Sequence, residues 1–225
     1  MYVHHVDPDI KWWTRKEWTQ FHGQMQGQVM GVVQDVTKTR TIVIGAHYDH
    51  VGLGEWGSRK PELAGQVHNG ADDNASGVAT MLELAARLKA QPPEHSVLIV
   101  ALDGEERGLL GAREFVRAPP VPLSSISLNL NFDMTARAET DGHLWVTGTY
   151  QHPNLRPLLE AMAPNGAVSI AVGQDTPQDT GENNWVDASD HGAFHEAVID
   201  ADMVVVGRHH DIAVCDTGSG DQADD

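Results

Sequence analysis

Cysteine and basic residues are scarce in this 225-residue chain, and it has no long apolar runs. The only cysteine is Cys215, which excludes a disulfide within the chain and a zinc site built from cysteines. Lysine and arginine number 15 against 32 aspartate and glutamate residues, so the formal net charge is -17. A surface this acidic repels nucleic acid and anionic membranes, and we expect neither as a partner.

Targeting signals are missing from the chain as given. Residues 1–5 have neither the basic start nor the apolar core of a secretory signal. No apolar run approaches the ~20 residues that a membrane-spanning helix needs. We therefore expect a soluble chain of one domain, whose length allows a substantial core. Its compartment and oligomeric state are unknown from the sequence.

Apolar runs and helical periods alternate along the chain from residue 41 onward. This order of strands and helices predicts right-handed crossovers and a mostly parallel mixed sheet. We expect a three-layer α/β/α sandwich with helices on both faces of the sheet. The clearest predicted strands are 41–47, 96–102 and 126–132, and the clearest helices are 78–90 and 109–117. Weaker patterns predict strands at 29–33, 144–146, 168–172 and 203–206, and helices at 155–162 and 192–197.

Four short acidic or histidine-bearing segments follow apolar runs or lie in the loops between them. Because the carboxyl ends of parallel strands meet at one edge of a sheet, we expect their side chains to converge. Taken singly, an Asp pair can cap the next helix, and a Glu pair can be a solvated surface feature. Taken together, imidazole and carboxylate groups in this order predict a metallohydrolase with paired metal ions. The segments contain His47-Tyr48-Asp49, Asp72-Asp73, Glu105-Glu106 and Asp133.

The four segments together resemble those of the co-catalytic zinc aminopeptidases. Relatives of that family include bacterial leucyl aminopeptidases, glutamate carboxypeptidase, glutaminyl cyclase and the transferrin receptor. The resemblance covers residues 29–206 and implies two zinc ions and a peptide substrate. It implies a zinc peptidase domain over residues 41–207, between a weakly patterned segment 1–40 and an acidic tail 208–225. Removal of N-terminal residues by zinc-activated water is the expected activity.

The resemblance also implies a role for each site residue. His47 and Asp133 would bind one zinc ion, and Glu106 would bind the other. Asp72 would bridge the two ions, next to a cis peptide bond between Asp72 and Asp73. Glu105 would act as the general base, and Asp49 would orient His47. The segment Ser189-Asp190-His191 is similar to one that lies near the substrate cleft in the family.

The chain departs from the family pattern in its tail. The family's fifth ligand is a His four residues before an Asp-Thr pair, and here Ile212 holds that position before Asp216-Thr217. The nearby His210 is the predicted fifth ligand, with an exposed loop histidine as the alternative. We expect the second zinc site to be the weaker one. Two alternatives to the aminopeptidase follow: a non-catalytic or single-metal homologue that acts as a binding module, and a related carboxypeptidase or cyclase.

Overall fold

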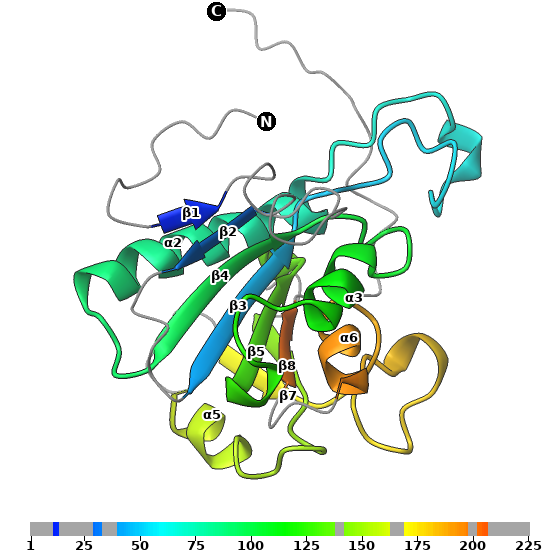
Figure 1. Cartoon of the computed structure of the whole chain (residues 1–225). Coiled ribbons are helices and arrows are strands. Elements are labelled where there is room, and N and C mark those ends of the chain that lie inside the picture. Colours follow the sequence, from blue (N-terminus) through cyan, green and yellow to red (C-terminus); the bar gives the residue numbers. More distant parts are fainter. Residues whose placement is uncertain are drawn as a thin grey trace, which may run out of the picture.

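The computed structural model describes residues 11–13, 29–32, 40–137, 142–162, 169–197 and 202–206. Within these ranges, eight strands form one sheet in the order β1-β2-β4-β3-β5-β8-β6-β7 (Figure 1). The strands are β1 (Lys11–Trp13), β2 (Val29–Val32), β3 (Thr41–His47), β4 (Ser96–Leu102), β5 (Ile126–Asp133), β6 (His143–Thr147), β7 (Ser169–Val172) and β8 (Asp202–Val206).

The centre of the sheet is parallel, and antiparallel pairs extend it on both sides. Strands β4, β3, β5 and β8 run parallel to one another in that order. On one side β2 pairs antiparallel with β4, and on the other β6 pairs antiparallel with β8. The predicted mostly parallel mixed sheet is therefore confirmed. The strand β1, which was not predicted, pairs with β2, so residues from the first 40 extend the same sheet.

Helices cover both faces of the sheet. The helices α2 (Gly77–Ala90) and α5 (Arg156–Met162) contribute Met81 and Leu159 to one buried cluster. The helices α3 (Leu110–Arg117) and α6 (His191–Glu196) contribute Phe115 and Phe194 to a second cluster. Figure 1 shows α2 behind the sheet, with α3 and α6 in front of it. The predicted three-layer α/β/α fold is confirmed.

The burial of strand β4 explains why its sequence is apolar from Val97 to Leu102. All seven of its residues are buried, and successive side chains point to opposite faces of the sheet. Leu98 and Val100 join the cluster beneath α3 and α6, whereas Val97 and Ile99 join the cluster beneath α2. A strand covered on both faces needs apolar residues at nearly every position, and Ser96 at its start is the exception. This is why its predicted bounds agree with the structure.

The parallel register brings the ends of three strands to one edge. His47 at the end of β3 lies opposite Leu102 at the end of β4, and Gly45 lies opposite Asn131 of β5. The polar residues that follow these strands therefore meet at this edge. Among the described residues, no helix combines the length and the hydropathy needed to cross a membrane.

Candidate metal centre

His47 is a buried imidazole that faces two carboxylates. Its side chain is 1% exposed, and its Nδ1 lies 3.1 Å from the backbone carbonyl oxygen of Asp49. Because a carbonyl can only accept, Nδ1 carries the proton and Nε2 is the atom that can bind a metal. Nε2 makes no hydrogen bond, and it lies 3.3 Å from Asp73 Oδ1 and 3.4 Å from Asp133 Oδ1.

The charges around His47 favour a cation between these groups. Burial acts to lower the pKa of His47, but the charge of Asp133 and contacts with the carboxylates of Asp133, Asp49 and Asp73 outweigh it. The pKa of His47 is therefore held well above its ordinary value. A proton or a metal ion can satisfy such a group of atoms, and metal binding displaces the proton.

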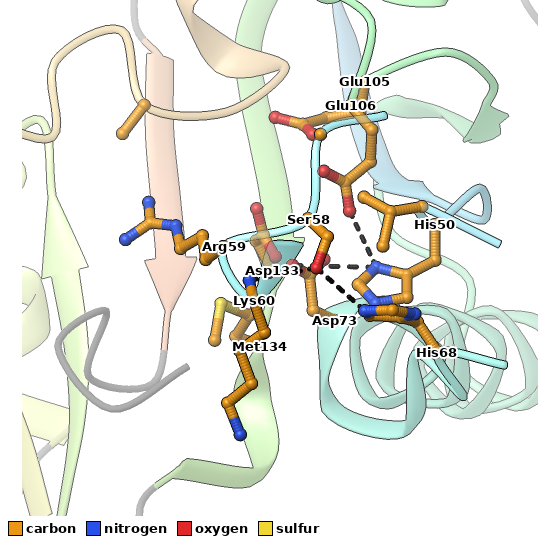
Figure 2. Close-up of a pocket in the computed structure, with 13 residues that line it drawn as sticks. His50, Ser58, Arg59, Lys60, His68, Asp73, Glu105, Glu106, Asp133 and Met134 are labelled. Carbon is orange, nitrogen blue, oxygen red and sulfur yellow. Dashed lines mark hydrogen bonds and ion pairs between the residues drawn. The ribbon is translucent and has the colours of Figure 1, made fainter. Parts of the chain in front are cut away.

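A second group of ligand atoms adjoins the first. The Nδ1 atom of His50 lies 2.7 Å from Glu106 Oε1 and 3.9 Å from Asp73 Oδ2 (Figure 2). Asp73 therefore directs one carboxylate oxygen toward each histidine. The ligand atoms of His47, Asp73 and Asp133 lie within 4.8 Å of one another, as do those of His50, Asp73 and Glu106. These two groups thus contain three of the predicted residues: His47, Glu106 and Asp133.

Asp72, which was predicted from the sequence to be the bridging ligand, lies outside both groups. Its Oδ1 accepts hydrogen bonds from the backbone N–H of Ala136 at 3.3 Å and from Ser76 Oγ at 3.4 Å. The cis peptide bond joins Asp73 to Asn74, so the predicted position between Asp72 and Asp73 was wrong by one residue. A loop has no side-chain period, so the sequence alone could not tell which of two adjacent aspartates faces His47.

Asn74 fixes the loop that carries Asp73. Its Nδ2 donates to the carbonyl of Phe132 at 2.9 Å, and its Oδ1 accepts from the backbone N–H groups of Gly77 at 3.0 Å and Met134 at 3.1 Å. The contacts with Phe132 and Met134 lie on either side of Asp133, where β5 ends. A side chain on Gly77 would collide with Asn74 Oδ1 and the Phe132 carbonyl, so only glycine fits at that position. Asn74 therefore fixes the position of the loop that carries Asp73 relative to Asp133.

Asp49 connects His47 to the turn after β4. Its two carboxylate oxygens accept the backbone N–H groups of Glu105 at 3.1 Å and Glu106 at 3.3 Å. Its Oδ1 lies 3.6 Å from His47 Nδ1, too far for a direct hydrogen bond. Burial acts to raise the pKa of Asp49, but His47 and the two amides outweigh it and lower the pKa. Asp49 therefore lies beside His47 and also positions the backbone of Glu105 and Glu106.

Glu105 lies at the same cavity as Glu106. Burial raises the pKa of Glu105 to about 9, with further increases from the charges of Asp133 and Asp190 and an opposing effect from His47. A carboxylate with a raised pKa is a stronger base than an exposed one. Positive charge from bound metal ions would act in the opposite direction and bring this pKa down.

The site opens into a cavity of about 280 Å³. Glu105, Glu106, Asp73 and Asp133 line it together with Arg59, Lys60 and other residues of the segment 50–68 (Figure 2). Within this segment, Ser58 Oγ lies 2.8 Å from His68 Nε2.

His210, the predicted fifth ligand, lies outside the described residues. His50 was missed by the sequence analysis, although its place three residues after His47 was a usable signal.

The sequence of the chain matches that of a known protein family. The sequence model described as peptidase family M28 matches residues 28–220. The chain belongs to peptidase family M28. Aminopeptidase YwaD of Bacillus subtilis is 27% identical to this M28 chain over 190 residues, which are 80% of this chain and 36% of that protein. The alkaline phosphatase isozyme conversion protein of Escherichia coli is 35% identical over 103 residues, 46% of this chain and 29% of that protein. This M28 chain thus spans well under half of either relative.

Solved structures resemble the M28 chain in fold. BSAP, a zinc aminopeptidase from Bacillus subtilis, superposes with a TM-score of 0.57 at 26% identity, covering 81% of this chain and 40% of that chain. A glutaminyl cyclase from Porphyromonas gingivalis superposes with a TM-score of 0.62 at 19% identity, covering 82% of this chain and 65% of that chain. The predicted relationship to the zinc aminopeptidases and their cyclase relatives is therefore confirmed at the level of family and fold.

Proposed function

We propose that this chain is the catalytic part of a zinc-dependent metallopeptidase. The observation that carries the proposal is the buried Nε2 of His47, which faces Asp73 and Asp133 and makes no hydrogen bond. Buried carboxylates are costly unless a cation compensates them, and imidazole nitrogen with carboxylate oxygen is a donor set that suits zinc. His47, Asp73 and Asp133 would hold one ion, and Asp73 and Glu106 would contribute to a second.

The residues of the chain divide the work of peptide hydrolysis among them. Zinc, when bound here, supplies a Lewis acid that polarises the substrate carbonyl and makes water more acidic. Glu105 takes a proton from the attacking water and returns it to the leaving amine. Asp49 keeps Glu105 in place through the backbone N–H of that residue. Asn74 keeps the bridging Asp73 in place relative to β5.

Release of N-terminal residues is the activity that we favour. YwaD is named an aminopeptidase, and BSAP is described as a zinc aminopeptidase. A third relative, from Mycobacterium tuberculosis, is named a probable lipoprotein aminopeptidase and is 32% identical over 136 residues, 60% of this chain and 24% of that protein. These names support peptide substrates with a free amino terminus, and peptides are the partners that we propose.

A second candidate activity rests on two cationic residues at the cavity. Arg59 and Lys60 line the same space as Glu105 and Asp133. Their charges would attract a substrate carboxylate near the bond to be cleaved, and they would repel a free amino terminus placed beside them. This arrangement is the reason to test a carboxypeptidase, or a peptidase that prefers acidic residues, as the second candidate.

The test of metallopeptidase activity uses the Glu105→Gln variant. Zinc content is measured together with hydrolysis of aminoacyl-nitroanilides, before and after treatment with a chelator. We expect Glu105→Gln to retain its zinc and to lose roughly 10² to 10⁴ in kcat, because it removes a general base and no ligand. Activity that survives complete removal of zinc, or an unchanged kcat in this variant, would contradict the proposal.

The two candidate activities are separated by substrate charge. One series contains aminoacyl-nitroanilides, and a second contains N-acylated dipeptides with a free C-terminal carboxylate. An aminopeptidase cleaves only the first series, whereas a carboxypeptidase cleaves the second. Arg59→Gln and Lys60→Gln should raise KM for the second series if the cationic residues bind its carboxylate. A chain that binds zinc but cleaves neither series would be the binding module.

A further inference from the structure

We infer that His50 is a direct ligand of the second metal ion, which it shares with Asp73 and Glu106. This inference rests on the proposed zinc centre. It adds a ligand from the loop that follows β3. His50 Nδ1 points at both carboxylates, 2.7 Å from Glu106 Oε1 and 3.9 Å from Asp73 Oδ2. Figure 2 shows the imidazole between Glu106 and Asp73, on the side of the cavity that also carries His68.

The two groups of ligand atoms have the same composition. Each contains one imidazole nitrogen and two carboxylate oxygens, and in each group these atoms lie within 4.8 Å of one another. Asp73 belongs to both, with Oδ1 directed to His47 and Oδ2 to His50. A carboxylate that presents a different oxygen to each of two nitrogen ligands has the geometry of a bridge between two ions.

Backbone packing places the His50 ring on the loop that carries Asp73. A Cβ on Gly70 would lie 2.9 Å from both Cβ and Cγ of His50, so the loop backbone approaches the ring closely. Gly70 has φ 64°, in the left-handed region that glycine adopts without strain. The loop that positions Asp73 therefore also confines the imidazole of His50.

The second group of ligand residues is more exposed to solvent than His47 and Asp133 of the first group. The side chains of His47 and Asp133 are 1% and 8% exposed, whereas those of His50, Asp73 and Glu106 are 18–22% exposed. Three protein ligands leave a coordination position free, and the second group faces the open cavity. Three carboxylates against two divalent ions leave a net positive centre, which favours an anionic oxygen at the free position.

His50 gives the second site three ligands without any residue from the tail. From the sequence, His210 was the predicted ligand for this purpose, and the second site was expected to be the weaker one. With His50 as ligand, the two sites have equal donor sets, and we expect two zinc ions per chain. His210 then becomes dispensable for binding the second ion.

Metal stoichiometry tests the inference directly. The parent protein and the variants His50→Ala, His210→Ala and His68→Ala are dialysed against a zinc buffer and analysed for bound zinc, and cobalt absorption is recorded in parallel. His68 is the matched control because it lines the same cavity but contacts Ser58. We expect about two ions in the parent, His68→Ala and His210→Ala, and one ion in His50→Ala.

The outcomes separate this inference from the proposed function. A parent that binds neither zinc nor cobalt would contradict the metallopeptidase itself. Two ions in His50→Ala, held as tightly as in the parent, would overturn the role of His50 and leave the metallopeptidase intact. Loss of one ion in His210→Ala but not in His50→Ala would assign the ligand to the tail.

A second variant distinguishes ligation from positioning. His50→Gln retains side-chain N–H groups that can hydrogen-bond to Glu106, but an amide is a poor zinc ligand. We expect it to lose the same ion as His50→Ala. Retention of two ions in His50→Gln would mean that His50 only orients Glu106. In crystals of the zinc-loaded parent, an anomalous peak about 2.0–2.1 Å from His50 Nδ1 would support ligation, and its absence there would refute it.

Discussion

Asp72 and Asp73 are adjacent and chemically identical, yet they contact different partners. Asp73 lies between the two histidines, whereas Asp72 accepts the Ala136 backbone N–H in the neighbouring turn. The backbone is non-helical at Asp73 and Asn74, and the two carboxylates contact different partners. A pair of matched variants can therefore test the assignment of the bridging residue.

We predict that Asp73→Asn loses both zinc ions and that Asp72→Asn retains them. Removal of the bridge takes one carboxylate oxygen from each group, while Asp72 contributes to neither. Zinc analysis of the two variants after dialysis checks the prediction, and each change removes one negative charge, so net charge is controlled. The reverse result would restore the bridge to Asp72.

Asp190 is a buried carboxylate that the proposed mechanism does not use. It is 0% exposed at the start of α6, and neither oxygen has a hydrogen-bond partner within the described residues. Burial raises its pKa from 3.8 to about 7, with an opposing effect from His47 and further increases from Asp133 and Asp49. Its ionised form is therefore unfavourable in the folded chain.

We predict that Asp190→Asn becomes more stable relative to the parent as pH rises. The unfolded chain releases this proton near pH 4 and the folded chain near pH 7, so ionisation destabilises the folded parent increasingly above pH 4. Asparagine does not titrate. Urea unfolding at pH 5 and pH 8, with chelator present, should show the difference in unfolding free energy moving in favour of the variant. A constant difference would contradict the raised pKa.

At the scale of elements, the loop before α2 is held to the end of β5 by one side chain. Asn74 uses its amide nitrogen and its amide oxygen on opposite sides of Asp133. A buried amide can donate and accept at once, and neither a carboxylate nor an apolar group can replace it. The contacts of this side chain therefore determine the separation between Asp73 and Asp133.

We predict that Asn74→Asp destabilises the chain by about 1–3 kcal/mol, because it places an acceptor against the Phe132 carbonyl. Zinc affinity should fall as well, since the loop carries Asp73. Asn69→Asp is the matched control, because the same change falls on an exposed residue of the same loop. Unfolding by denaturant and zinc titration measure both effects. Equal stability of the two variants would exclude the anchoring role.

At the scale of the whole molecule, three acidic side chains of this acidic chain cluster at one edge of the sheet. The carboxylates of Asp73, Glu106 and Asp133 lie close together there in a chain whose formal net charge is -17. Their mutual repulsion opposes folding unless a cation is bound. Metal binding should therefore contribute to global stability as well as to catalysis.

We predict that chelation lowers the unfolding temperature of the parent. An ion bound only to the folded state at 100 times its Kd contributes about 2.7 kcal/mol. For a domain of this size that corresponds to roughly 5–11 °C per ion. Differential scanning calorimetry with and without chelator measures the change, and re-addition of zinc should reverse it. Asp73→Asn is the control, and we expect it to respond little to the chelator.

The sequence predicted the sheet well where side chains were buried on both faces. The apolar run of β4 has bounds that its burial explains, and α2 is set by the helical spacing of Met81 and Ala85. Prediction was weaker for β1, a three-residue strand at the edge of the sheet, and for the antiparallel direction of β6, whose partner β8 lies far along the chain. The division of the chain at residues 40 and 207 stays a prediction.

Composition and pattern by themselves determined the α/β class, the acidic character and the convergence of His47, Glu106 and Asp133 at one edge. Periodic burial and the order of the strands are local properties, so they can be read from the chain. Only the tertiary structure decided that Asp73, and not Asp72, lies between His47 and His50, and that His50 lies against Glu106. These two assignments depend on the direction of side chains in loops, which is set by distant contacts such as those of Asn74 with Phe132 and Met134.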